Sequence, residues 1–240
     1  SFIEMAPFLY QESYGSAQIR GNADLQNGYN YNIDLRYELF EKNGDMLSIT
    51  AYYKHLKAPI ERVQTLSGGS AVHSFRNADN GMATGVEIEF RKEIVKDLRF
   101  GVNGSYMYTN VKLPKGGAYT NSQRALQGAS PYLANADLTY SPAFSNDRQL
   151  SVALLYNLQG PRIHSVGISG LGDIKQQPVH TLNFTGSYRF NRRFAVKLQV
   201  NDLLNQDILF KQEVPTTGDK VEVERFRKGT GFEVGFSYDL

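Results

Sequence analysis

The stretch from Thr230 to Leu240, TGFEVGFSYDL, alternates large apolar residues with small or polar ones. One side carries Phe232, Val234, Phe236, Tyr238 and Leu240; the other carries Glu233, Gly235, Ser237 and Asp239. Successive side chains of a β-strand point to opposite faces, so the stretch predicts a strand with one apolar face. A strand at a sheet edge leaves backbone N–H and C=O groups unpaired. Closing the sheet into a barrel removes the edge, and this closure is obligatory in lipid. The stretch therefore predicts the closing strand of a membrane barrel; an amphipathic strand ending a soluble β-domain is the alternative.

The composition of the 240 residues fits one all-β domain. The net charge of +2, with 21% charged residues, gives no reason to expect a nucleic-acid partner. The chain has no cysteine, which excludes disulfides and cysteine-based metal sites. Mean hydropathy is −0.41, and no run approaches the ~18 apolar residues of a membrane helix. No signal peptide begins at Ser1, so we expect either a mature chain or one whose beginning is missing.

The same alternation recurs along the whole chain, most regularly in YNYNIDLRYELF over 29–40. Ten strands are predicted, over 1–10, 29–40, 45–62, 72–92, 98–112, 132–141, 149–163, 179–190, 193–212 and 221–240. The connections at 41–44, 93–97, 143–147 and 191–192 are short, and those at 13–27, 65–71, 113–130, 164–177 and 213–220 are longer. Short turns at one rim and long loops at the other are typical of an antiparallel transmembrane β-barrel with its turns in the periplasm.

The polar face of these strands carries large charged side chains. The candidate lumen-facing residues are Asp34, Arg36, Glu38, Glu87, Glu89, Arg91, Arg189 and Lys197. They fit either a solvated barrel interior or a surface that contacts a plug or lines a path. Two aromatic pairs, Tyr52–Tyr53 and Tyr106/Tyr108, are interpreted as a girdle at the level of the lipid headgroups rather than as a sugar-stacking site.

Catalytic chemistry has no signature in the sequence. His55, His73, His164 and His180 lack metal-ligand spacing and are interpreted as solvated loop or rim residues. The run over 167–170 does not match the nucleophile elbow, and no phosphate-binding glycine loop occurs. We therefore predict no enzyme and no catalytic, cofactor or metal site.

The chain ending resembles the assembly signal of bacterial outer-membrane proteins. The matching residues are Glu233, Gly235, Tyr238 and Leu240, with Leu240 where that family usually has Phe. The resemblance implies recognition by the barrel-assembly machinery and a place in the outer membrane of a Gram-negative bacterium, in contact with lipid and lipopolysaccharide.

Five segments resemble the barrel of TonB-dependent outer-membrane receptors, especially of the Bacteroidota type. They are FIEMAPFLY (2–10), IRGNADL (19–25), SFRNADNGMATGVEIEFRKEI (74–94), RALQGASPYLANADLTYS (124–141) and LQVNDLLNQDILFKQE (198–213). The resemblance implies that the chain, residues 1–240, is the C-terminal portion of a 22-stranded barrel, with about ten strands present and the N-terminal plug absent. It also implies energised uptake of a scarce or large ligand, such as an iron chelate, cobalamin, a glycan or a peptide. The partners it implies are the TonB system, acting through the plug, and a surface lipoprotein. The alternative function is a soluble all-β, carbohydrate-binding-like module.

Overall fold

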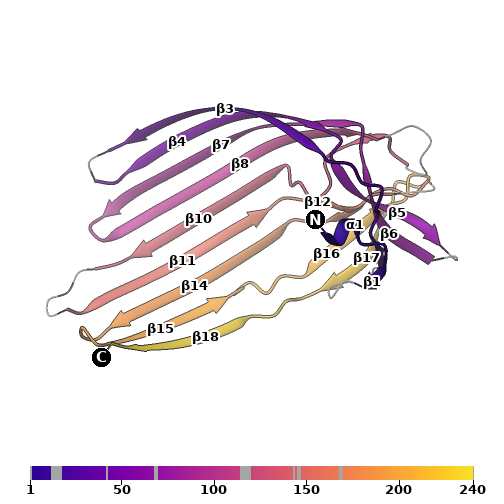
Figure 1. Cartoon of the computed structure of the whole chain (residues 1–240). Helices are drawn as coiled ribbons and strands as arrows, with labels where there is room; N and C mark the ends of the chain where they lie inside the picture. The colour runs from indigo at the N-terminus through magenta and orange to yellow at the C-terminus, as the bar shows by residue number, and fades with distance from the viewer. Residues whose placement is uncertain are drawn as a thin grey trace.

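The computed structural model describes residues 2–11, 18–41, 43–67, 70–113, 120–142, 144, 147–167 and 170–239. Nine long strands lie side by side in one curved sheet, which we call the wall (Figure 1). In spatial order they are β18 (Gly231–Tyr238), β15 (Phe194–Asn201), β14 (Val179–Arg189), β11 (Gln149–Gln159), β10 (Tyr132–Tyr140), β8 (Leu98–Lys112), β7 (Asn80–Val95), β4 (Met46–Lys57) and β3 (Tyr29–Phe40). Every neighbouring pair is antiparallel, as the sequence predicts.

The remaining elements gather at one end of the wall and form what we call the rim (Figure 1). One four-stranded sheet contains β1 (Leu9–Gln11), β2 (Gln18–Arg20), β6 (Ser70–Asn77) and β5 (Ile60–Ser67); a second contains β12 (Arg162–Ser165), β13 (Ile174–Gln176), β16 (Ile208–Glu213) and β17 (Lys220–Phe226). The short strand β9 (Gln123–Arg124) pairs with the end of β8. The opposite end of the wall carries the short turns, so the predicted alternation of short and long connections is confirmed.

Five of the predicted strands, over 45–62, 72–92, 149–163, 193–212 and 221–240, are each divided where the chain passes between the wall and the rim. Ala58 has a φ of 50° and precedes Pro59, which has no N–H to donate, so the ladder of β4 ends there. Gly160–Pro161 separates β11 from β12 in the same way. Asp202, with a φ of 55°, ends β15, and Gly229, with a φ of 85°, precedes β18. These left-handed residues and prolines redirect the chain out of the wall and into the two smaller sheets.

The strand predicted over 1–10 is wrong. Residues Phe2–Met5 form a short helix, α1, and only Leu9–Gln11 forms a strand, β1, which pairs with β2. The segment lacks true alternation, because apolar residues stand next to one another on both sides of Pro7. Asn22 N donates a hydrogen bond to Glu4 O at 2.7 Å, which fixes α1 against the rim.

The wall is open in the part of the chain that the structure describes. Strands β3 and β18 are its two edges, and no ladder between residues 2–10 and 230–239 occurs among the described residues. Within that same part of the chain, no helix is long and apolar enough to cross a membrane.

Candidate ligand-binding rim and the faces of the wall

All eight polar residues proposed for the lumen lie on one face of the wall, which we call the polar face. The ladders set Arg36 opposite Thr50 and Thr50 opposite Glu87, and the same register continues across the sheet to Lys197 and Gly235. The residues that share this parity are Asp34, Arg36, Glu38, Glu87, Glu89, Arg91, Arg189 and Lys197. That this face lines a lumen remains a prediction.

The polar face carries side-chain hydrogen bonds between strands and ion pairs within single strands. Asn135 Nδ2 donates to Asn103 Oδ1 at 2.7 Å, and Asn157 Nδ2 donates to Asn135 Oδ1 at 2.5 Å. Ion pairs of 2.6 Å join Arg36 Nη2 to Glu38 Oε1 and Arg91 Nη2 to Glu89 Oε1. Because these arginines are more than half exposed, each pair contributes little to stability. The side chains of this face are therefore suited to contact with water.

The opposite, apolar face carries the large hydrophobic side chains of every strand of the wall. Leu35 is 77% exposed, Phe232 74% and Phe236 72%. A soluble protein rarely leaves so large an apolar surface uncovered, whereas a membrane barrel presents it to lipid.

The assembly-signal residues divide between the two faces. Glu233 and Gly235 lie on the polar face, opposite Gln199 and Lys197, while Tyr238 lies on the apolar face opposite Phe194. Leu240 lies outside the described residues. Recognition of these residues by the assembly machinery stays a prediction.

Three of the four tyrosines interpreted as a girdle lie on the apolar face, and the fourth does not. That the three lie at the level of the headgroups stays a prediction. Tyr53, Tyr106 and Tyr108 are exposed on the apolar face near the rim. Tyr52, as the neighbour of Tyr53 in one strand, necessarily points to the polar face. Its hydroxyl lies over Gly85, where a Cβ would come within 2.5 Å of the Tyr52 hydroxyl oxygen.

A buried ion pair lies where the long connections meet in the rim. Glu61 of β5 and Arg124 of β9 contact each other through Oε2 and Nη2 at 2.6 Å, and their side chains are only 2% and 3% exposed. Arg124 Nη1 donates to Ala125 O at 3.0 Å. The N–H direction toward Glu61 does not meet hydrogen-bond geometry, so Arg124 Nε and Nη2 lack a hydrogen-bond acceptor among the described residues.

Burial has the largest effect on the pKa of Glu61 in this pair. Removal from water raises the pKa of the Glu61 carboxyl above its ordinary value, although the Arg124 charge and the Gln127 backbone N–H act in the opposite direction. The contact with Arg124 therefore only partly offsets the cost of burying the carboxylate.

Side-chain hydrogen bonds join three long connections around this pair. Arg62 Nε donates to His73 Nδ1 at 2.8 Å within the β5–β6 hairpin. Gln127 Oε1 accepts from Arg62 N at 2.8 Å, and Gln127 Nε2 donates to His164 O at 2.5 Å. One glutamine thus connects the hairpin over 58–79 with the segments 120–131 and 160–167.

The rim histidines are correctly located but differ in their burial. His73 is 6% exposed, so its interpretation as a solvated residue is wrong; it is enclosed because Arg62 and Ser165 approach the same ring nitrogen. His164 stacks edge-on against Phe210, with ring centroids 4.8 Å apart. The described residues contain no group of three metal-ligating side chains.

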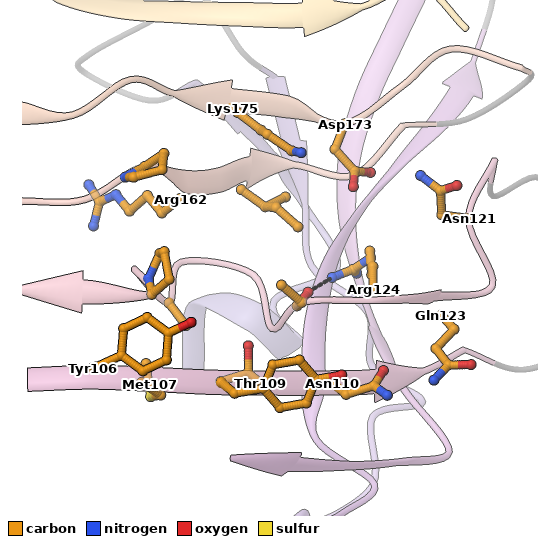
Figure 2. Close-up of a pocket in the computed structure, with 16 residues that line it drawn as sticks. Tyr106, Met107, Thr109, Asn110, Asn121, Gln123, Arg124, Arg162, Asp173 and Lys175 are labelled. Atoms are coloured by element: carbon orange, nitrogen blue, oxygen red, sulfur yellow. Dashed lines mark hydrogen bonds between the residues drawn. The ribbon is translucent and has the colours of Figure 1, made fainter. Parts of the chain in front are cut away.

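Two cavities flank the segment that carries Arg124 and Gln127. The inner cavity, about 470 Å³, is lined by residues that include Glu4, Leu56, Arg62, Phe75 and His164, and lies on the polar-face side, where Leu56 points. The outer cavity, about 630 Å³, lies between the end of β8 and strands β12 and β13 (Figure 2). Its lining includes Tyr106, Tyr108, Arg124, Arg162, Asp173 and Lys175. Sequence reasoning missed Glu61, Arg124 and Gln127, since contacts between residues far apart in the chain leave no periodic signal.

A third group of charges is partly exposed at the edge of the rim. Asp207 accepts hydrogen bonds from Arg227 Nε and from Arg225 Nη1, the latter at 3.1 Å, and Glu222 accepts two from Arg225. The hydrogen bond from Arg227 lowers the pKa of Asp207, and that from Arg225 lowers the pKa of Glu222.

A curved antiparallel wall with one exposed apolar face and aromatic side chains near its rim defines a transmembrane β-barrel protein. A model of the outer membrane protein beta-barrel family matches residues 1–238. The chain belongs to this family and resides in the outer membrane, so the alternative of a soluble carbohydrate-binding module does not hold.

Solved structures with the same fold include three outer-membrane proteins. The ferric enterobactin receptor of Pseudomonas aeruginosa is 17% identical with a TM-score of 0.61, covering 98% of this chain and 36% of its own. The ferric yersiniabactin uptake receptor of Yersinia pestis is 17% identical with a TM-score of 0.59, covering 89% and 30%. The copper transporter OprC is 15% identical with a TM-score of 0.62, covering 91% and 32%. The chain thus spans about a third of the length of these structures. No curated protein matches it in sequence.

Proposed function

We propose that this chain is the C-terminal portion of the barrel of a TonB-dependent outer-membrane receptor of the Bacteroidota type. The whole protein would take up a scarce or large ligand, with energy delivered by the TonB system through a plug. The observation that carries the proposal is the rim, where the β5–β6 hairpin and the segments 120–131 and 160–167 are tied together by Gln127 and a buried ion pair. Long connections held in one geometry above a rigid wall are where binding residues usually lie.

The proposed ligand is one of the classes that the sequence resemblance implies: an iron chelate, cobalamin, a glycan or a peptide. The likeness to receptors for ferric siderophores and to a copper transporter supports a metal-linked cargo within that set. The inner cavity is the candidate contact for the cargo, because it opens on the polar-face side and its lining mixes Arg62 and His164 with Phe75.

The proposal also accounts for the two open edges of the wall and for its polar face. The two open edges, β3 and β18, would pair with strands of the same barrel, and the polar face would surround the plug. A surface lipoprotein and the barrel-assembly machinery are the further partners in this scheme. No residue of the rim is assigned a catalytic role.

Uptake by a strain that lacks the full-length protein tests the proposal. The deletion strain should lose uptake of one ligand class from a panel of ferric chelates, cobalamin, oligosaccharides and peptides. Uptake restored by the full-length protein should stop when the proton-motive force is dissipated. Restored uptake that persists without that energy would contradict a TonB-driven receptor and indicate passive diffusion.

A further inference from the structure

A buried histidine of the rim holds an arginine that lines the inner cavity. His73 of β6 is 6% exposed, and its Nδ1 accepts a hydrogen bond of 2.8 Å from Arg62 Nε of β5. Arg62 lines the inner cavity together with Phe75 and Gln127. The hydrogen bond therefore fixes the Nε edge of this guanidinium against β6 and withholds its N–H from any molecule in the cavity.

The same hydrogen bond defines the protonation state of His73. Arginine has only donors and keeps its proton in proteins, so Arg62 Nε donates and His73 Nδ1 accepts. An imidazole that accepts at Nδ1 carries its single proton on Nε2 and is neutral. Ser165 Oγ lies 3.5 Å from the same Nδ1. His73 is therefore a neutral acceptor enclosed between an arginine and a serine.

A proton added to Nδ1 of His73 would break this contact. Both nitrogens of a protonated imidazole carry hydrogen, so the ring would have no acceptor left for Arg62. Two positive charges would then meet across the 2.8 Å that separates the two nitrogens, in a buried site where repulsion is stronger than in water. Histidine is the side chain whose ordinary titration falls between about pH 5 and pH 8. The contact therefore responds to pH through His73, because the arginine does not titrate.

The neighbouring charges determine where a released arginine can go. The charged and titratable residues of the described elements around this pair are Glu61 of β5, Arg20 of β2, Arg76 of β6, Glu4 of α1, and Arg162 and His164 of β12. Glu61 adjoins Arg62 in β5, so its side chain points to the other face of the strand, where Arg124 contacts it. Glu4, by contrast, lines the inner cavity with Arg62. Arg62 is also less buried than His73, so the arginine turns toward the cavity while the histidine stays enclosed.

We propose that His73 is a pH-sensitive switch on the inner cavity, whose protonation releases Arg62 from β6 and presents its Nε edge to the cavity. The released edge offers two parallel N–H groups, the arrangement that binds two oxygens of a carboxylate or another oxyanion. Acid therefore converts this side of the cavity into a site for an anionic group. The effect on cargo rests on the proposed function, whereas the release of Arg62 does not.

Crystal structures of the full-length protein at about pH 7.5 and about pH 4.5, on either side of the ordinary histidine value, test the release. The Arg62–His73 hydrogen bond should be present at the higher pH and absent at the lower, with the β5–β6 ladder unchanged because only side chains move. His73→Gln is the control and should hold Arg62 at both pH values, since its side-chain oxygen accepts a hydrogen bond and does not titrate. An intact wild-type hydrogen bond at the lower pH would overturn the proposal, and so would release of Arg62 in His73→Gln.

Binding of para-fluorobenzenesulfonate, which is an anion at both pH values, measures the effect on the cavity by fluorine NMR. The full-length wild type should bind this probe about tenfold more tightly at the lower pH, the contribution of one hydrogen bond between charged groups. His73→Gln should show little of this gain, and Arg62→Gln should lose it; heat-modifiable gel migration verifies that both are folded. An equal gain in wild type and His73→Gln would overturn the switch. Loss of energised uptake, by contrast, bears on the proposed function alone and changes neither result.

Discussion

Apolar side chains have opposite environments in the wall and in the rim. In the wall, Leu35 and Phe236 are among the most exposed large apolar residues, at 77% and 72%, whereas Val111, at the rim end of β8, and Val166 in the rim are fully enclosed. Ala78, Val111 and Leu113 form a small apolar core there, against which Leu126 packs. Polar side chains show the reverse: Arg36 is half exposed on the wall, while Glu61 and Arg124 are buried in the rim.

The difference indicates that the apolar side chains of the wall are suited to contact with lipid, whereas those of the rim pack against one another. The wall buries few apolar side chains in the part of the chain that the structure describes, Ala83 and Val200 among them. It relies on backbone ladders, with lipid taking the place of a hydrophobic interior. The rim is organised as a small soluble domain, with a core and a hydrogen-bonded polar network in which Arg124 Nε and Nη2 lack an acceptor among the described residues. Substitutions should therefore have opposite consequences in the two regions.

The largest effect is expected from breaking the buried pair in the rim. Glu61→Leu leaves the Arg124 charge buried, and because arginine cannot lose its proton, we expect a cost of about 3–5 kcal/mol in rim stability. Local stability is measurable from amide hydrogen exchange over β5 and β9. The double variant Glu61→Leu/Arg124→Leu should recover most of the loss; a double variant as unstable as the single would show that the charges are not coupled.

A charge on the apolar face of the wall should have the next largest effect. Val196→Arg, or Leu35→Arg, should cost roughly 2–4 kcal/mol of barrel stability in lipid. The neighbouring polar-face variants Lys197→Gln and Asp34→Asn are the matched controls and should be nearly neutral. Equilibrium unfolding of the full-length protein in vesicles measures both. Equal costs for the two classes would mean that the apolar face does not contact lipid.

Lowering the pH should change the stability of two parts of the rim in opposite directions. This is the smallest of the three expected effects. The pKa of Asp207 is lowered by Arg227 and that of Glu222 by Arg225, so their contribution to stability is present above the ordinary carboxyl pKa and lost as pH falls. The pKa of Glu61 is raised by burial, so its contribution is full below the ordinary value and lost as pH rises through the folded-state pKa. Between pH 7 and pH 4, hydrogen exchange corrected for intrinsic rates should lose protection in β16 and β17 but not in β5. Parallel loss in both would contradict these assignments.

The wall could be predicted from the sequence because alternation is a local signal. In YNYNIDLRYELF every second residue from Tyr29 to Leu39 is apolar and lies on the apolar face, so the pattern alone predicts the face. The division of strands at Ala58–Pro59, Gly160–Pro161 and Asp202 was also open to prediction, since these are turn signals inside long apolar runs. Their omission extended the strands predicted over 45–62, 149–163 and 193–212 past the end of the wall.

The rim could not be predicted in the same way. Glu61 and Arg124 are 63 positions apart in the numbering, and Gln127 contacts both Arg62 and His164. Such contacts depend on how the loops fold back on one another, which leaves no period in the sequence. The burial of His73 follows from the same tertiary packing.

Labelling of single cysteines in intact cells tests the central claim most directly, namely that the rim faces outward and the short turns face the periplasm. This chain has no native cysteine. The predicted loop position Gly117 lies outside the described residues, and Gly170 has a φ of 85°, which strains any other residue. Thr216, exposed in the turn between β16 and β17, is the better site in the rim, and Asn43 serves for the opposite end. A membrane-impermeant maleimide should label Thr216→Cys and leave Asn43→Cys protected until the outer membrane is opened. Labelling of Asn43→Cys alone in intact cells would invert the topology and contradict the account.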